Sequence, residues 1–335
     1  MQQRSDRKSS VEEKLVVVPD DDPPVMADSS ALVRLKAYPG VRVRVHMSLP
    51  ADEDDLRYRL ARAHTAIFTR SAGHMTRSVM AGLHSLRHVV LTGAAAEVPD
   101  MEAARELGIQ VTHTPDTVSD AVAEHTLALM LALARRVPEL DQRVRAGEWP
   151  RGLITQLSGK TLGIVGTGVT GRKLARLAAG IGMSILAWSP DRIDEHVGQS
   201  RDVDLDYLLQ NADVVSVHVR LSEAAGRMFG QRQFVLMKPT ALFINTERAG
   251  LVDEAALAQA LTSQTIAGAA LDVFTQEPLP RESPLLGLPG VILSPHTAAS
   301  TQEALQADLD AAVQNVIAFL EGRAADAALP SPERV

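Results

Sequence analysis

Three polar side chains that can carry out acid–base and carboxylate chemistry each follow an apolar run of the sequence. Arg248, Glu277 and His296 come after runs that end near residues 245, 271 and 293. If these runs are neighbouring strands of an open parallel sheet, their carboxyl ends share the edge at which such sheets bind ligands. The chain has no cysteine, so catalysis has to use histidine, carboxylates, arginine and a cofactor. We therefore expect the three side chains to converge on a bound ligand.

A glycine motif upstream indicates which ligand this is. The segment TLGIVGTGVTG is an apolar run followed by Gly166, Gly168 and Gly171 in the spacing GxGxxG. The first glycine permits a tight turn, the second lets the backbone approach a pyrophosphate, and the third lets a helix pack close to the strand. The amides of Val169 and Thr170, at the start of that helix, would point at the anion. The motif predicts a dinucleotide site.

The residues after the next predicted strand, Ser184–Trp188, bear on the choice between NAD and NADP. An acid is expected there to hold the ribose of NAD, but the sequence has Ser189. Asp191 can take this role from two residues further on, which favours NAD. Alternatively, Ser189 and Arg192 can accept the 2′-phosphate of NADP, although Asp191 would repel it. We predict NAD as the cofactor, with NADP as the alternative.

Short β-branched runs alternate with helical patterns along the chain, which predicts parallel sheets covered by helices. Strands are expected first at 15–18, 41–45, 66–68 and 88–91, with helices at 30–37, 52–63 and 76–83. A long helix, Ser119–Arg136, follows; it is apolar on most faces, which predicts that it is buried, either in the core or across a subunit interface. Further strands are expected at 161–165, 184–188, 214–218, 241–245, 267–271 and 291–293, with helices at 169–181 and 302–321.

These elements predict an α/β fold with two doubly wound parallel-sheet domains. Residues 1–115 together with 300–335 are expected to form a flavodoxin-like substrate domain, which is the catalytic domain. Residues 116–299 are expected to form a Rossmann dinucleotide-binding domain inserted into it. Two domains also fit the length of 335 residues.

The composition excludes several other classes of protein. The chain is 45% hydrophobic and has a formal net charge of −7, which gives no basic surface for nucleic acid or anionic lipid. No membrane span or signal peptide is apparent, and with the absence of cysteine this predicts a cytoplasmic protein. No metal site is predicted, because the remaining histidines lack partners at ligand spacing; His125 is expected to be merely packed inside the long helix.

Four motifs follow one another in the second half of the chain: the glycine loop at 166–171, INTERAGLVDE (244–254), AGAALDVFTQEP (267–278) and SPHTAAST (294–301). In this order and spacing they resemble the D-isomer-specific 2-hydroxyacid dehydrogenase family, which includes phosphoglycerate dehydrogenase, D-lactate dehydrogenase and glyoxylate/hydroxypyruvate reductases. The resemblance implies an enzyme that transfers a hydride between a nicotinamide cofactor and C2 of a small 2-oxo or 2-hydroxy acid.

The resemblance implies a role for each polar side chain. His296 would be the general acid and base, since imidazole titrates near neutral pH. Glu277 would orient His296 and stabilise its charged form, and Arg248 would grip the substrate carboxylate through a forked contact. Asp272 would receive the nicotinamide carboxamide. The implied cofactor-binding set comprises Gly166, Gly168, Val169, Thr170, Gly171, Ser189, Val219, Arg220, Thr246, Asp272 and Ala298.

Substrate recognition is expected from the first domain. Arg70 and Ser71 resemble the phosphoglycerate dehydrogenase loop that contacts the far end of the substrate, and Ala94 and Ala95 resemble the loop whose amides hold the substrate carboxylate. Ala95 and Ala249 stand where the family commonly has glycine. Because an added methyl group would narrow the pocket, no single substrate is predicted.

Two functions from different classes share this fold. The first is the enzyme, reducing acids such as hydroxypyruvate or glyoxylate, with formate or phosphite as a further substrate class. The alternative is a non-catalytic, dinucleotide-sensing binding protein resembling the C-terminal-binding-protein corepressors, which have the same Arg/Glu/His set. The family and the apolar helix Ser119–Arg136 also imply a homodimer.

Overall fold

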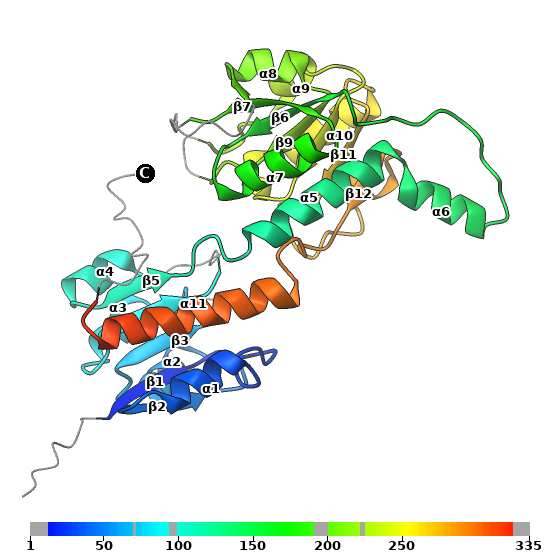
Figure 1. Ribbon diagram of the computed structural model, residues 1–335. Helices are drawn as coiled ribbons and strands as arrows, with labels where there is room; N and C mark the ends of the chain where they lie inside the picture. Colours follow the sequence, from blue (N-terminus) through cyan, green and yellow to red (C-terminus); the bar gives the residue numbers. More distant parts are fainter. Residues whose placement is uncertain (1–12, 70–71, 94–98, 191–199, 222–224, 324–335) are drawn as a thin grey trace, which may run out of the picture. The chain divides into compact units, whose positions relative to one another are not determined.

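The computed structural model describes residues 13–69, 72–93, 99–190, 200–221 and 225–323, and it divides the chain into two α/β units (Figure 1). Unit 1 contains the described residues up to Val118 and from Gln302 onward. Unit 2 contains the described residues of Ser119–Thr301. The chain therefore leaves unit 1 once and returns to it once.

Unit 1 is built on a five-stranded parallel sheet in the order β2-β1-β3-β4-β5. This is the flavodoxin-like order. The direction in which successive strands are added reverses between β1 and β3, and this place is the topological switch point of the sheet. The strands are Lys14–Val18 (β1), Val41–Val45 (β2), Thr65–Phe68 (β3), His88–Leu91 (β4) and Gln110–His113 (β5). Helices α1 (Ser30–Ala37) and α11 (Gln302–Leu320) pack on one face, and α2 (Glu53–Leu60), α3 (Arg77–Ala81) and α4 (Met101–Glu106) pack on the other.

The sequence of β1 shows why this sheet is covered on both faces. Its side chains alternate between the two hydrophobic cores, with Val16 and Val18 in one and Leu15 and Val17 in the other. A strand buried on both sides is a continuous apolar run, which is typical of parallel sheets. β5 and α4 were not predicted, because β5 is a short strand of mostly polar residues, QVTH, that gives little hydrophobic signal.

Unit 2 is built on a seven-stranded parallel sheet in the order β12-β11-β10-β9-β6-β7-β8. The strands are Thr161–Val165 (β6), Ser184–Trp188 (β7), Arg201–Asp202 (β8), Val214–Val217 (β9), Leu242–Asn245 (β10), Gly268–Leu271 (β11) and Val291–Leu293 (β12). The order is that of a Rossmann fold extended by β12, with its switch point between β6 and β9. The predicted fold class, two doubly wound parallel-sheet domains, is confirmed.

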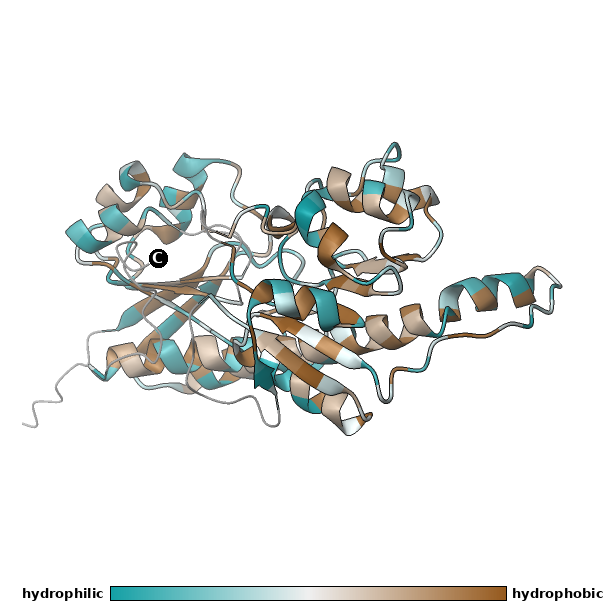
Figure 2. Cartoon of the chain, turned by 90° about the horizontal axis from the view of Figure 1, so that it is seen from above, coloured by the Kyte–Doolittle hydropathy of each residue, from teal (hydrophilic) through white to brown (hydrophobic). Residues whose placement is uncertain are grey.

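Helices cover both faces of the unit 2 sheet. On one face lie α5 (Ser119–Ala134) and α7 (Val169–Gly180), and on the other lie α8 (Leu205–Asn211), α9 (Gln231–Leu236) and α10 (Glu254–Thr262) (Figure 1). Two short 3₁₀ turns, Ala249–Leu251 and Pro284–Gly287, complete the connections. Figure 2 shows hydrophobic stretches within the strands, as coverage by helices on both faces requires, whereas the edge strands β2, β5 and β8 contain polar residues.

The long helix ends earlier than predicted. α5 stops at Ala134, Arg136 adopts a left-handed φ of 50°, and a separate helix, α6 (Val137–Arg145), begins with Pro138 in its first turn. The proline ring is accepted there because the first turn has no intrahelical acceptor for its missing N–H. Within the single chain, α5 buries one side against α7, β10 and β11. Within α6, no residue is buried.

Candidate functional site

Three neighbouring strands of unit 2 end side by side. The register pairs Asn245 at the end of β10 with Leu271 at the end of β11, and Leu271 with Leu293 at the end of β12. The loops that leave these ends carry Arg248, Glu277 and His296, in that order. The predicted catalytic side chains therefore belong to loops that start from one edge of one sheet.

Two of these side chains form a hydrogen-bonded pair. His296 Nδ1 lies 2.8 Å from Glu277 Oε2, and Glu277 Oε1 accepts a hydrogen bond from the backbone N–H of Phe274 at 2.9 Å. The second contact fixes the carboxylate that faces the imidazole. The pair is open to solvent, with side-chain exposures of 51% for His296 and 37% for Glu277. Within the described part of the chain, no partner is found for His296 Nε2, so this nitrogen is available to a ligand.

Arg248 directly precedes the 3₁₀ turn after β10, and two hydrogen bonds made by the Asn245 side chain fix the backbone around it. Asn245 donates from Nδ2 to the Arg248 carbonyl at 3.0 Å and accepts from the Glu247 N–H at 3.0 Å. The guanidinium donates from Nη1 to the Glu247 carbonyl at 2.8 Å, which leaves other N–H groups of this planar fork for a carboxylate. Burial raises the pKa of the Glu247 carboxyl, and the positive charges of Arg248 and Arg220 oppose that rise.

Asp272, directly after β11, is completely buried. Its Oδ1 accepts from the Ser294 hydroxyl at 2.6 Å and from Thr297 N–H at 3.0 Å, and its Oδ2 accepts from Ala298 N–H at 2.8 Å. These donors lie on both sides of His296 in the sequence. The carboxylate therefore holds the loop that carries His296.

The glycine loop after β6 has the geometry that its motif predicts. Gly166 has a φ of 107°, and a Cβ placed on it would lie 2.4 Å from the carbonyl carbon of His218, so only glycine fits this turn. A Cβ on Gly171 would lie 2.2 Å from the Gly166 carbonyl oxygen, which shows how closely α7 packs on the loop. At Gly168, by contrast, a Cβ would meet no described heavy atom within 4 Å. Gly168 precedes Val169 and Thr170 in the first turn of α7, so the loop presents backbone to solvent at a helix N-terminus.

The other predicted cofactor residues lie around the same edge. Val219 and Arg220 follow β9, the first buried and the second exposed, and Ser189 directly follows β7. Thr246 follows β10 and is buried, with its hydroxyl 2.9 Å from that of Thr126 on α5. Ala298 is buried beside Asp272.

The predicted substrate residues Arg70, Ser71, Ala94 and Ala95 lie outside the described residues, as do Asp191 and Arg192. Within the described ranges there is no cluster of three metal-ligating side chains, and no helix long and apolar enough to cross a membrane.

Sequence reasoning missed the contacts of three polar residues at this edge, namely His125, Ser294 and His218. His125 on α5 has Nε2 3.1 Å from Ser294 Oγ, and Ser294 contacts Asp272. His218, after β9, is buried, with its Nε2 2.9 Å from Ser216 Oγ, and burial lowers its pKa to about 4. The SPH motif contains Ser294, but sequence spacing gave no sign of the contact with His125, 169 positions away.

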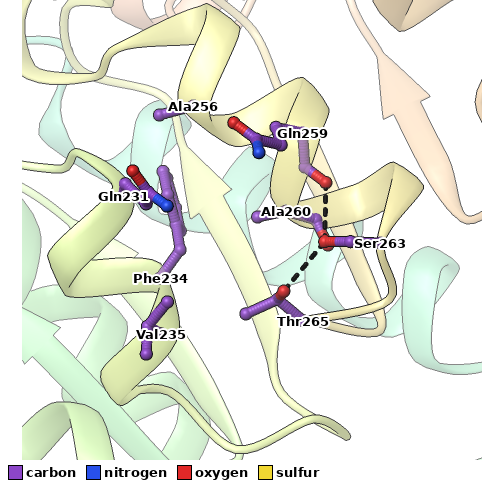
Figure 3. A pocket seen from close by; sticks show the side chains of 8 residues that line it. All are labelled: Gln231, Phe234, Val235, Ala256, Gln259, Ala260, Ser263 and Thr265. Carbon is purple, nitrogen blue, oxygen red and sulfur yellow. Dashed lines mark hydrogen bonds between the residues drawn. The ribbon is translucent and has the colours of Figure 1, made fainter.

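A separate small pocket lies between α9 and α10 (Figure 3). The Ser263 hydroxyl there is already bonded to the Gln259 carbonyl at 2.8 Å and lies 2.9 Å from the Thr265 hydroxyl. None of the predicted site residues lines this pocket, which is formed by Gln231, Phe234, Val235, Ala256, Gln259, Ala260, Ser263 and Thr265.

Known proteins are similar to this chain in sequence and in fold. The family described as "D-isomer specific 2-hydroxyacid dehydrogenase, NAD binding domain" matches residues 127–298. A glyoxylate reductase of Thermococcus litoralis is 42% identical over 235 residues, covering 67% of this chain and 70% of the relative. A D-3-phosphoglycerate dehydrogenase of Methanocaldococcus jannaschii is 38% identical over 272 residues, covering 79% of this chain but only 52% of the relative. A crystal structure of a protein from Thermus thermophilus superimposes with a TM-score of 0.81 at 34% identity, covering 95% of this chain and all of that one.

Proposed function

Because the chain belongs to the D-isomer-specific 2-hydroxyacid dehydrogenase family, we propose that it interconverts a small 2-oxo acid and its 2-hydroxy acid. The observation that carries this proposal is the 2.8 Å hydrogen bond between His296 Nδ1 and Glu277 Oε2, in a pair that solvent can reach. Acid–base chemistry needs such an accessible imidazole with a fixed orientation.

The cofactor of this family is a nicotinamide dinucleotide, and the glycine loop fits its pyrophosphate. Gly168 has open space where a Cβ would stand, and the first turn of α7 follows it, so backbone N–H groups there would face a bound pyrophosphate. We assign the adenosine side to Ser189, Val219 and Arg220, and the nicotinamide side to Thr246, Asp272 and Ala298. When bound, NAD or NADP supplies the hydride carrier of the reaction.

His296 is proposed to move the proton at Nε2. A carboxylate can only accept, so the contact with Glu277 requires the proton of Nδ1 to point at Oε2. In reduction the charged imidazole gives its Nε2 proton to the substrate carbonyl oxygen, and in oxidation the neutral ring takes the hydroxyl proton. Glu277 supports both directions, because its carboxylate accepts the Nδ1 proton and so keeps the ring in one orientation.

Arg248 is proposed to bind the substrate carboxylate. Its guanidinium is tied at Nη1 to the Glu247 carbonyl, so the planar fork is already oriented before a ligand binds. A carboxylate held there keeps the adjacent 2-oxo group in a fixed position. Selectivity for the rest of the substrate is proposed to come from residues 1–115 and 300–335, with Arg70, Ser71, Ala94 and Ala95 as contacts.

A homodimer is also proposed, formed through α5 and the segment after it. Apolar side chains there are exposed, including Val137 at 54%, Trp149 at 75% and Leu153 at 101%. Exposed apolar groups gathered on one segment are typical of a protein interface. The absence of cysteine fits a reducing compartment such as the cytoplasm.

The test is a spectrophotometric screen of 2-oxo acids with NADH and NADPH. We expect turnover of at least one acid, and we expect His296→Asn to lower kcat by on the order of 10²-fold or more. His84→Asn, which alters an exposed histidine of unit 1, is the matched control and should leave kcat unchanged. Dinucleotide binding without turnover across the whole panel would instead support a dinucleotide-sensing binding protein.

A further inference from the structure

The histidine on α5 contacts the network behind the catalytic loop. His125 Nε2 lies 3.1 Å from Ser294 Oγ and 3.5 Å from Asp272 Oδ1. The side chain is 26% exposed, so simple packing in a core does not account for its position. The next residue on the helix, Thr126, contacts the hydroxyl of Thr246 at 2.9 Å. One turn of α5 therefore contacts the residues that follow both β10 and β12.

The hydrogen bonds in this network have a defined direction. Asp272 accepts from two backbone N–H groups and lies 2.6 Å from Ser294 Oγ, and as a carboxylate it can only accept. The single hydroxyl proton of Ser294 therefore points at Asp272. Ser294 Oγ is then the acceptor toward His125, which assigns the imidazole proton to Nε2. The chain of donors runs from His125 through Ser294 to Asp272.

This series of hydrogen bonds ends on the loop that contains His296. The His296 N–H donates to the Ser294 carbonyl at 3.0 Å, and the N–H groups of Thr297 and Ala298 donate to Asp272. His296 itself has a φ of 53°, a left-handed conformation that is uncommon for a residue other than glycine. Such a conformation persists only where the surroundings fix it on both sides.

We propose that His125 is a positioning residue for His296. By donating from Nε2 to Ser294, it keeps the Ser294 hydroxyl on Asp272 and so holds the loop in which His296 takes its left-handed conformation. His125 touches neither substrate nor reacting atoms in this role. The inference rests on the proposed function only for its effect on turnover, because its effect on the loop is independent of what the protein catalyses.

The test compares two substitutions at one position. His125→Leu removes the donor with similar bulk, whereas His125→Gln keeps an N–H at the reach of Nε2. We expect His125→Leu to lower kcat about 10-fold while the Kd for the dinucleotide and the KM for the 2-oxo acid change less than about threefold. His125→Gln should restore kcat to within about threefold of the wild type. Glu124→Ala, at the exposed neighbouring position, should behave as the wild type.

Amide hydrogen exchange gives a readout that does not need turnover. In His125→Leu, the amides of Thr297 and Ala298 should exchange at least about 10-fold faster than in the wild type, and Glu124→Ala should leave them unchanged. If the wild type turned over no acid but this acceleration appeared, the proposed function would fail and the positioning role would stand. Unchanged exchange, or a glutamine variant as impaired as the leucine variant, would overturn the positioning role.

A second substitution covers the case in which His125→Leu does not fold. Ser294→Ala removes the hydroxyl that links His125 to Asp272. It should produce the same faster exchange of the Thr297 and Ala298 amides and the same fall in kcat. Where both single variants fold, the double variant should be no worse than either one, because they interrupt the same chain. Additive losses would contradict the proposal.

Discussion

Each unit has a switch point at the carboxyl edge of its parallel sheet, but the two are built differently. In unit 1, Asp20 follows β1 and accepts from the N–H of Thr69, which follows β3, at 2.9 Å. In unit 2, Gly166 follows β6 and turns tightly against His218, and Gly168 beyond it faces open space. A side chain bridges the first switch point, whereas the second presents backbone to a ligand.

Buried carboxylates show the same contrast. In unit 1, Asp308 on α11 accepts from the Gly93 N–H at 2.9 Å, from Thr117 Oγ1 at 3.0 Å and from Thr114 Oγ1. It thus ties α11 to the segment by which the chain leaves unit 1. In unit 2, Asp272 collects similar donors, but the loop it holds carries the exposed His296. The difference teaches that a buried carboxylate with backbone donors can tie a segment in place in either unit, and that only in unit 2 does the tied loop carry the exposed imidazole to which we assign the reaction.

The largest effect is expected from substitutions of the glycines at the unit 2 switch point. Gly166→Ala places a Cβ 2.4 Å from the His218 backbone at a φ of 107°, so it should destabilise unit 2 by several kcal/mol and abolish dinucleotide binding. Gly168→Ala meets no described atom, so it should leave stability unchanged and raise the dinucleotide Kd about 10-fold or more, because its methyl group stands where the pyrophosphate approaches. Urea unfolding and titration of NADH fluorescence measure the two effects.

Gly287→Ala is the control for this pair, since it also meets open space but lies outside the site. It should change neither stability nor affinity. Equal losses of affinity in Gly168→Ala and Gly287→Ala would mean that the glycine loop does not hold the dinucleotide.

A smaller effect is expected on the pH dependence of stability, to which a buried histidine in each unit contributes. His88 in β4 is fully buried, bonded to Thr112 Oγ1 at 2.9 Å and stacked on Phe319, and burial lowers its pKa to about 3. The folded state therefore binds the proton less readily than the unfolded chain. Stability from this group is present above pH 6.5 and is lost as the pH falls toward 3, by up to about 3 kcal/mol at pH 4.

His88→Gln tests this loss, because it keeps a group that can bond Thr112 but cannot titrate. Urea unfolding of unit 1 between pH 7 and 4 should show a flatter dependence in this variant than in the wild type. His84→Gln, at an exposed position of the same unit, should keep the wild-type slope. Burial lowers the pKa of His218 in unit 2 to about 4, so His218 should contribute a loss of its own as the pH falls from 6.5, and the His88→Gln variant should retain that loss. A slope equal to that of the wild type would show that His88 does not titrate as its burial requires.

The sequence allowed most of the sheets to be predicted, because strands buried on both faces are continuous apolar runs. β4 and β6 are such runs and have their predicted bounds, as do β7 and β12; β2 (VRVRV) also has its predicted bounds, although it alternates valine with exposed arginine and was recognised by its β-branched residues. The glycine loop and the placement of Arg248, Glu277 and His296 after adjacent strands followed from the same pattern.

Contacts between distant polar residues could not be predicted. The bond between Thr114 and Asp308 joins positions 194 apart, and nothing in the periodicity of α11 distinguishes Asp308 from a solvated acid. His125 likewise lies in an apolar helix whose pattern indicates packing alone. The end of α5 at Ala134 was also not predicted. Arg136 adopts a left-handed backbone conformation without a capping hydrogen bond from its side chain, so its residue type does not indicate the turn.

The smallest expected effect concerns the tie in unit 1. Burial raises the pKa of the Asp308 carboxyl, against the hydrogen bonds that lower it, so the folded state binds this proton more tightly than the unfolded chain. Stability from this group is therefore complete below the ordinary carboxyl pKa and falls as the pH rises through the raised value. Asp308→Asn keeps an acceptor and removes the titration, so it should change stability at neutral pH by no more than about 1 kcal/mol and flatten this fall. Asp308→Ala leaves the Thr114 hydroxyl without this acceptor, while the Gly93 N–H keeps Thr114 Oγ1 and the Thr117 hydroxyl keeps the Thr114 carbonyl, and it should cost about 1–3 kcal/mol.

Asp310→Asn is the matched control for these variants, because Asp310 lies on the same helix, is partly exposed and pairs with Arg34 at 2.7 Å. It should leave the pH dependence as in the wild type, since exposed ion pairs contribute little. Urea unfolding of unit 1 from pH 4 to 7 measures all three. If Asp308→Asn lowered kcat as strongly as His125→Leu while leaving stability unchanged, the contrast between the two buried carboxylates would be wrong, and the unit 1 edge would have to be counted with the reactive one.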